Sequence, residues 1–315
     1  MILALALACA PADLPADAEP GPAVGGWQDG ADLPFPRQEH GVVTADAEVV
    51  IIAGVDEGPL TGNWVQSYQP FDDTWRDLPS LPVQVHHPNV VALDDGSILL
   101  LGALDAAFDQ QPHYYVLPHE GSQWQALPAP PDDRVVGAAG VALLDGRVHL
   151  VGGLRNRSSV ALHSVFDPTD GSWEALPDAP SARDHLALGA IGDRLVAAAG
   201  RDGGLASFVD ATEVWTEANG WGTGTAIPTP RAGVAAAVLD GRLHVFGGEG
   251  ASTGSGVFAE HEAYDPDTNR WESFDDMPEP RHGMGAAVVD DVIWIPGGAP
   301  VDNFGAEAVI QGFSL

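Results

Sequence analysis

Residues 235–271 read AAAVLDGRLHVFGGEGASTGSGVFAEHEAYDPDTNRW, which is the pattern of one small antiparallel sheet. The stretch holds a small-apolar run, an Asp-Gly pair, a second apolar run that stops at two glycines, a Tyr-Asp-Pro turn and a tryptophan. Asp-Gly between two apolar runs is a strong hairpin signal, because both central residues of the tight turn need positive φ. The stretch therefore predicts four short strands, a to d, with Trp271 on strand d.

The same pattern recurs along the chain with a period close to fifty. Its marker tryptophans stand 48, 49, 49, 48 and 50 residues apart, at Trp27, Trp75, Trp124, Trp173, Trp221 and Trp271. One small sheet cannot bury both faces until neighbours stack on it, so this period indicates propeller blades. The first tryptophan has no strands a to c before it, and the last repeat has no tryptophan after it. We therefore predict an all-β, six-bladed propeller with four antiparallel strands per blade, whose last blade is closed by the N-terminal strand around Trp27.

With these markers the chain resembles the kelch repeat, and the resemblance covers residues 27 to 315. The apolar strand b ends at a double glycine in three repeats and at a single glycine in the others: Gly152-Gly153, Gly247-Gly248 and Gly297-Gly298, against Gly54, Gly102 and Gly200. Glycine here permits a turn or a close approach between blades that a Cβ would block. The resemblance implies a six-bladed kelch propeller of a bacterial exported type, occupying residues 23–315 as one domain.

The charge balance excludes some classes of partner. The chain has 13 basic residues, all arginine, against 45 acidic ones, for a net charge of −32. Such a surface repels nucleic acid and anionic membrane. We expect a monomer that meets a membrane only through a lipid anchor, if it has one.

Residues 1–22 have the pattern of an export signal followed by a Pro/Ala/Asp-rich linker. The apolar run is shorter than the ~20 residues that span a bilayer, and it resembles a bacterial lipoprotein signal with Cys9 as the lipidated residue. No basic residue precedes the run, and Ala6 stands where such signals favour Leu. Two localisations stay open: a lipoprotein in the periplasm or at the outer membrane or cell surface, and a secreted protein. Cys9 is the only cysteine, so disulfides and thiolate chemistry in the folded domain are excluded.

Strand order assigns possible sites to one face of the disc. The b–c loops and the starts of strands a share a face, whereas the a–b and c–d turns on the other face are short. Loops that a rigid scaffold positions are where propellers keep function. Arginine recurs nine residues before the a–b turn in four blades, with His86 there in blade 2 and Val136 in blade 3, and His40, His87, His185 and His282 are close by. The candidate ligand-binding residues are Arg37, His40, His86, Arg183, His185, Arg231, Arg281 and His282.

The arginines allow two interpretations. Guanidinium groups gathered around an axis would suit a carboxylate, sulfate, phosphate or acidic sugar. Alternatively, arginine at this position is structural and pairs with acidic residues of an adjacent blade, such as Asp29, Asp32, Asp77, Asp132 or Asp178. His149 and His244, on strand b, are expected to be packing residues.

Two functions follow from these alternatives. The favoured one is a non-enzymatic interaction module that binds a protein or a glycan through the b–c loop face. The other is a carbohydrate-active enzyme resembling the kelch-type N-acetylneuraminate epimerases, in which the Arg/His ring works with a loop carboxylate. The loop carboxylates that could serve are Asp56, Glu57, Glu249 and Glu260. We expect no catalytic set, cofactor or metal. Asp265, Asp267 and Asn269 mimic a calcium loop without its glycine, and the radical cofactor of the kelch-type copper oxidases needs a cysteine.

Overall fold

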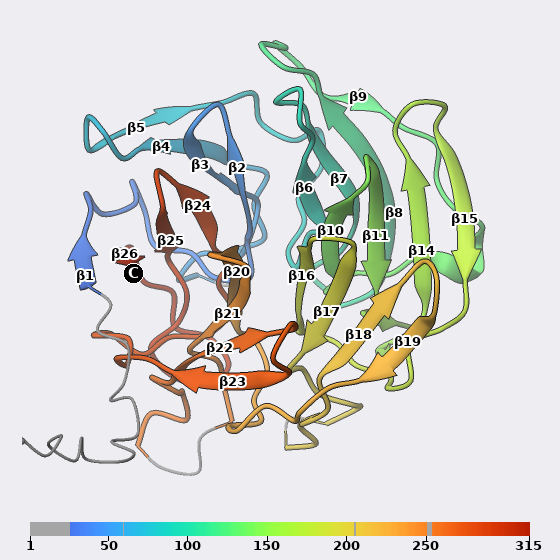
Figure 1. Cartoon of the computed structure of the whole chain (residues 1–315). Coiled ribbons are helices and arrows are strands. Elements are labelled where there is room, and N and C mark those ends of the chain that lie inside the picture. The colour runs from blue at the N-terminus through green and yellow to red at the C-terminus, as the bar shows by residue number, and fades with distance from the viewer. Residues whose placement is uncertain (1–25, 59, 205, 251–253) are drawn as a thin grey trace, which may run out of the picture.

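Six four-stranded antiparallel sheets surround a central channel in the computed structural model, which describes residues 26–58, 60–204, 206–250 and 254–315 (Figure 1). The predicted six-bladed, all-β architecture is confirmed. The predicted export segment and Cys9 lie outside the described residues. Within them, no helix is both long enough and apolar enough to cross a membrane.

Each blade runs outward from the axis through strands a, b, c and d. Blades 1 to 3 consist of β2 (Gly41–Ala45), β3 (Glu48–Ile52), β4 (Val65–Gln69) and β5 (Thr74–Asp77); β6 (Val90–Ala92), β7 (Ile98–Leu104), β8 (Gln110–Leu117) and β9 (Gln125–Ala126); and β10 (Gly140–Leu144), β11 (Arg147–Val151), β14 (His163–Asp167) and β15 (Ser172–Leu176). Blades 4 to 6 consist of β16 (Ala187–Ile191), β17 (Arg194–Ala198), β18 (Glu213–Thr216) and β19 (Gly220–Thr223); β20 (Ala235–Leu239), β21 (Arg242–Phe246), β22 (His261–Asp265) and β23 (Arg270–Ser273); and β24 (Ala287–Val289), β25 (Val292–Pro296), β26 (Ile310–Ser314) and β1 (Gly26–Asp29). A short ribbon of β12 (Leu154–Arg155) and β13 (Ser158–Ser159) and a 3-10 turn η1 (Asp132–Arg134) complete the elements.

The blades bury apolar surface by stacking on one another. The inner strands β2, β6, β10, β16, β20 and β24 contact their neighbours in a closed circle. The clusters of buried side chains lie between blades: one joins Phe246 of blade 5 to Ile293 and Phe313 of blade 6. No single sheet could cover these residues, which is why the fold needs the whole ring.

The ring closes as the tryptophan spacing predicted. Strand β1 pairs with β26 so that Trp27 lies opposite Phe313, and the N-terminal strand thereby becomes strand d of blade 6. The marker tryptophans also link neighbouring blades, since five of the six indole N–H groups donate to a carbonyl beyond strand d of the preceding blade. These bonds are Trp27 to Asp275 (3.3 Å), Trp75 to Ala31 (2.7 Å), Trp124 to Pro79 (2.7 Å), Trp173 to Pro128 (3.0 Å) and Trp271 to Thr225 (2.9 Å).

The glycines after strand b allow the blades to approach closely. A Cβ on Gly247 would lie 2.4 Å from the carbonyl oxygen of Arg281 in the next blade. The adjacent Gly248 has a φ of +112° and donates its N–H to the same carbonyl at 2.9 Å. A backbone hydrogen bond thus passes directly from one blade to the next, and this contact places the start of strand a beside the axis.

Candidate functional site

Six backbone positions at the starts of the inner strands form a closed ring around the axis. Each residue has a φ between +49° and +65°, and each N–H donates to the carbonyl of the equivalent residue in the preceding blade at 2.6 to 3.2 Å. In chain order the six are Glu39, His87, Ala138, His185, Gly233 and Gly283. Left-handed backbone is unfavourable for residues other than glycine, so the ring holds four of them in a conformation that an isolated chain would avoid.

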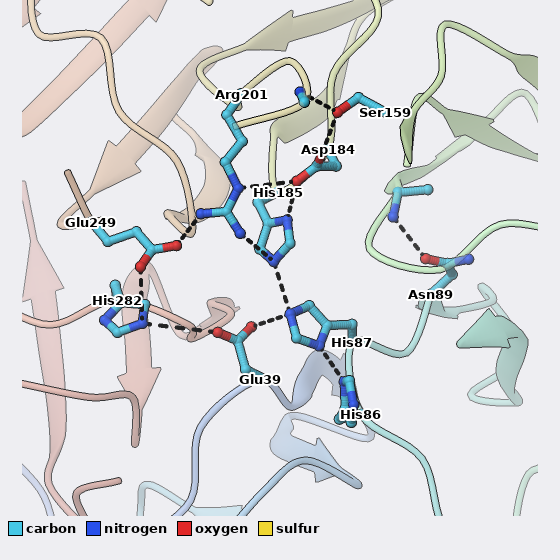
Figure 2. A network of polar contacts seen from close by, with 12 residues as sticks. Glu39, His86, His87, Asn89, Ser159, Asp184, His185, Arg201, Glu249 and His282 are labelled. Carbon is cyan, nitrogen blue, oxygen red and sulfur yellow. Dashed lines mark hydrogen bonds and ion pairs between the residues drawn. The ribbon is translucent and has the colours of Figure 1, made fainter. Parts of the chain in front are cut away.

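Three of these positions bring ionisable side chains together at the mouth of the channel (Figure 2). Nε2 of His87 lies 3.0 Å from Oε2 of Glu39 and 2.8 Å from Nε2 of His185. Although the three residues come from blades 1, 2 and 4, their ligand atoms all lie within 4.8 Å of one another. The backbone ring is the reason, because it gives each blade one side chain at the axis.

Four further side chains surround this trio. Arg201 places Nε 3.3 Å from Oδ1 of Asp184 and an NH2 group 3.3 Å from Nε2 of His185, and it also pairs with Glu249. Nε2 of His282 lies 3.5 Å from Oε2 of Glu249. We call these residues the mouth cluster: Glu39, His87, Asp184, His185, Arg201, Glu249 and His282.

The cluster shifts the titration of its own members. Burial alone would raise the pKa of the Glu39 carboxyl, but charge interaction and hydrogen bonding with His87, helped by His185 and His282, hold that pKa well below its usual range. Burial and the nearby Arg201 guanidinium lower the pKa of His185, against the opposing effect of Asp184. Glu39 is therefore ionised and His185 neutral near pH 7.

A small cavity opens beside the trio. It has a volume of ≈ 120 Å³, and Glu39, His87 and His185 line it together with the small residues Ala138, Gly233 and Gly283. Below it the channel continues between the inner strands as a second space of ≈ 170 Å³. One alanine and two glycines on the ring leave room for a small ligand next to two imidazoles and a carboxylate.

The four arginines of the predicted ring do not belong to this cluster. Arg37, Arg183, Arg231 and Arg281 are at most 1% exposed and lie inside their own blades. Arg231, for example, donates to the carbonyls of Gly247 (2.6 Å) and Val245 (3.1 Å) at the end of strand b. Burial lowers the pKa of Arg37 to about 9, which leaves it charged at neutral pH. In this structure these groups offer no accessible surface to an anion.

The buried arginines are paired, but not with the acidic residues of adjacent blades that the structural interpretation of the sequence predicted. Each arginine bonds to strand c of the same blade, about thirty residues later, rather than to an acidic residue of an adjacent blade. The pairs are Arg37 with Gln66 (2.5 Å), Arg183 with Glu213 (3.0 Å), Arg231 with Glu262 (2.5 Å) and Arg281 with Gln311 (3.0 Å). Asp77 and Asp29 contribute indirectly, because Gln66 and Gln311 donate to them at 2.9 and 3.3 Å.

The register in blade 2 differs by one residue from the prediction. His86 pairs with Leu104 in the way that Asp184 pairs with Arg201 and His282 with Ala299, so Val85 takes the arginine position. The cause is the a–b turn of this blade, which is one residue longer and closes between Leu93 and Ser97. His86 is buried with Nδ1 against Nδ1 of His87, and it supports the cluster from below.

The other histidines fill the interior. His40 is buried with Nε2 3.0 Å from the carbonyl oxygen of Pro296. His149 lies 2.9 Å from His163, and His244 lies 2.9 Å from His261, as nitrogen-to-nitrogen pairs inside blades 3 and 5. His149 and His244 are thus packing residues in this structure.

Of the candidate residues, the structure brings His185 and His282 into the mouth cluster and leaves the others outside it. Glu39, Asp184 and Arg201 were missed, and His87 was noted only as a neighbour of the arginines. A usable signal was present, since Glu39 and His185 both follow an arginine by two residues. The hypothesis of an enzyme acting on an acidic sugar needed accessible guanidinium groups, and the burial of the four arginines of the predicted ring gives it no support. The mouth cluster, with its carboxylates and imidazoles, suits a cation or a proton instead.

Comparisons with known proteins agree with the architecture. A family model described as "KLHDC2/KLHL20/DRC7 Kelch-repeats domain" matches residues 137–309, more than half of the chain. Kelch-like protein terF of Aspergillus terreus is 31% identical over 249 residues, which cover 73% of this chain and 54% of that protein. Kelch repeat and BTB domain-containing protein 13 of Homo sapiens is 33% identical over 132 residues, 41% of this chain and 28% of that protein.

Kelch-like protein 33 of Homo sapiens is 34% identical over 152 residues, 47% of this chain and 27% of that protein. The chain thus spans about half of the length of the first relative and less of the other two. By its repeats, its blade geometry and these matches, the chain belongs to the kelch-repeat family.

Proposed function

We propose that this chain is an interaction module that binds a protein partner through the face that carries the b–c loops and the mouth cluster. The proposal rests on where the exposed apolar side chains are. Leu60, Phe108, Val301 and Phe304 are 64%, 37%, 41% and 52% exposed, and all four belong to b–c loops. Large apolar residues left in water on one face of a folded domain are typical of an interaction surface.

The opposite face lacks this pattern in the described part of the chain. Its turns are short, and two large apolar residues are well exposed there: Phe71 in the c–d turn of blade 1, at 90%, and Leu315 directly after β26, at 51%. Isolated exposed apolar side chains need no functional explanation. The contrast between the faces therefore favours the b–c side.

Charge adds a property of the partner. The b–c loops carry exposed carboxylates beside the apolar residues, at Glu57, Asp109, Asp202 and Asp302. A surface with both features is complementary to one that combines apolar and basic side chains. We therefore expect a partner with a basic, partly apolar binding surface.

The test compares three forms of the immobilised protein: wild type, the double variant Leu60→Ser with Phe304→Ser, and Phe71→Ser as the matched control. Proteins retained from an extract of the source organism are quantified by mass spectrometry, and those retained are then titrated as purified proteins. We expect the double variant to bind at least about tenfold more weakly, as for loss of a hot-spot side chain, and Phe71→Ser to bind like wild type.

Equal binding by all three forms would contradict the assignment of the face. A glycan partner, the alternative left open by the sequence, would instead give signals on a glycan array that the double variant loses. Binding that only Phe71→Ser loses would move the site to the opposite face.

A further inference from the structure

We propose that Glu39, His87 and His185 bind one divalent transition-metal ion, with Zn²⁺ the best match, at the mouth of the channel. The donor set is two imidazole nitrogens and one carboxylate oxygen. This combination holds Zn²⁺ with a fourth position open to water or a ligand.

The distances suit such an ion. Tetrahedral ligands at about 2.0 to 2.1 Å from Zn²⁺ lie about 3.3 Å from each other. His87 Nε2 is 3.0 Å from the Glu39 carboxylate and 2.8 Å from His185 Nε2, so these two pairs need to separate by only a few tenths of an ångström, and all three ligand atoms already lie within 4.8 Å of one another. Rotation of side chains at the edge of a cavity provides that movement without a change in the backbone ring.

The hydrogen bond behind His185 leaves a lone pair where the ion would be. Nδ1 of His185 bonds to the Asp184 carboxylate, so this nitrogen carries the proton and Nε2 carries the lone pair. That lone pair faces Nε2 of His87, and the Arg201 NH2 group 3.3 Å away would move aside for an ion. Nε2 of His87 hydrogen-bonds the Glu39 carboxylate, and an ion bound there would replace the proton of that bond, while Nδ1 of His87 faces Nδ1 of His86. Two Nε2 atoms that face each other can share one proton or bind one cation.

The second layer of contacts is also that of a metal site. A carboxylate on the far nitrogen of a ligand histidine fixes its tautomer and orientation. Asp184 has this role for His185 and is itself held by Ser159 and Arg201. Such outer contacts are what distinguish a constructed site from a chance group of three side chains.

Charge and access complete the argument. The mouth cluster contains three carboxylates, Glu39, Asp184 and Glu249, against one guanidinium, Arg201, in a chain of net charge −32. A divalent cation would therefore be attracted to the cluster. The ≈ 120 Å³ cavity gives the fourth coordination position room for a water molecule.

The experiment uses the full chain without a histidine tag and with Cys9→Ser, so that no thiol contributes. After treatment with a chelator, Zn²⁺ is titrated by calorimetry. We expect one ion per chain. His87→Gln and His185→Gln should each weaken binding by more than about 100-fold, and Asp184→Asn by about 10- to 100-fold, as for other outer-layer changes.

The matched control is His119→Gln. His119 also lies 3.0 Å from a carboxylate, that of Asp46, but on the opposite face and without a third ligand, so Zn²⁺ affinity should not change. Binding well below one ion per chain, or equal affinity in His119→Gln and His185→Gln, would overturn the proposal.

A second measurement removes the dependence on folding of the variants. X-ray absorption of Zn²⁺-loaded chain carrying only Cys9→Ser should show two imidazole ligands and oxygen ligands at about 2.0 to 2.1 Å. A shell of oxygen alone, or a single imidazole, would contradict the assignment even if a variant failed to fold.

Discussion

The interiors of the blades and the mouth of the channel use the same side chains in different ways. Inside blade 5, Arg231 is fully buried, bonds to Glu262 and satisfies several carbonyls. At the mouth, the side chain of Arg201 is 13% exposed and pairs with Glu249 and Asp184 beside a cavity. Histidine divides likewise between buried pairs and the axial trio. Residue type therefore does not distinguish the blade interior from the mouth cluster in this protein; position relative to the channel does.

The buried histidine pairs predict a steep loss of stability in acid. Burial lowers the pKa of His149 and His244 to about 4, of His163 to about 3 and of His261 to about 2. Above pH 6.5 these imidazoles are neutral in both the folded and the unfolded chain and contribute nothing. Below it only the unfolded chain binds protons, so the free energy of unfolding falls by about 1.4 kcal/mol per pH unit for each imidazole.

Urea unfolding between pH 7 and pH 5 measures this slope. The double variant His149→Phe with His163→Leu should make the slope shallower by about 2.7 kcal/mol per pH unit, because two of the four groups no longer titrate. If the dependence of the free energy of unfolding on pH is unchanged in the double variant, burial in the blade does not keep His149 and His163 unprotonated.

Removal of a buried arginine should have the next largest effect. Arg231→Met leaves the Glu262 carboxylate buried without its partner and should lower the free energy of unfolding by about 3 to 5 kcal/mol. Arg201→Met, at the mouth, leaves Asp184 with its bonds to Ser159 and His185 and leaves Glu249 beside His282, so it should cost only about 1 to 2 kcal/mol. Both values come from urea unfolding at pH 7.

A double variant that removes both members of the buried ion pair tests the comparison between the blade interior and the channel mouth. Arg231→Met combined with Glu262→Leu removes both charges, and replacing a buried ion pair with apolar residues is often close to neutral. We expect this double variant to recover most of the loss. If the double variant is as unstable as Arg231→Met alone, most of the lost stability comes from carbonyl groups that no longer have Arg231 as hydrogen-bond donor, and not from the unpaired charge of Glu262.

The smallest effect is expected at the axial ring itself. His87 has a φ of +49°, and two blades already have glycine at this position. His87→Gly relieves the backbone, because glycine adopts this conformation readily, but it loses the contacts of His87 with Glu39 and His185, so the net change in the free energy of unfolding should stay within about 1 kcal/mol of zero.

Ala138→Gly is the matched control, since Ala138 stands at the same ring position with a φ of +53° and no polar side chain. Its change in stability reports the backbone effect alone. A loss of stability in His87→Gly much greater than in Ala138→Gly would mean that the mouth cluster contributes to folding, contrary to the comparison.

The architecture could be predicted in detail, because the same kinds of sequence marker recur through the six repeats. Six tryptophans at one spacing, and a first one without preceding strands, were enough to predict six blades and the pairing of Trp27 with the last blade. The tight turns and glycines depend on local backbone conformation, which short sequence motifs report directly. The one error of register, at His86, came from an a–b turn one residue longer than the others.

The candidate residues and the mouth cluster lie at the same end of the channel, but only His185 and His282 belong to both sets. The recurring arginines were conspicuous because they stand at the same position of four repeats. They share that position because each one makes the same kind of structural contact inside its own blade. Their partners lie about thirty residues later on strand c, at Glu213 and Glu262 among others. In the two blades with valine instead of arginine, strand c has Tyr115 or Ser164 at the matching place. This correlation is readable only once the strand register is known.

By itself, the sequence determined the period, the number of blades, the closure of the ring and the face on which long loops gather, since each depends on local pattern or on counting. Only the tertiary structure decided which polar groups are buried and which meet at the axis. Glu39, His87 and His185 are 48 and 98 residues apart along the chain. They become neighbours because six backbone hydrogen bonds close around the channel, and no local pattern records that contact.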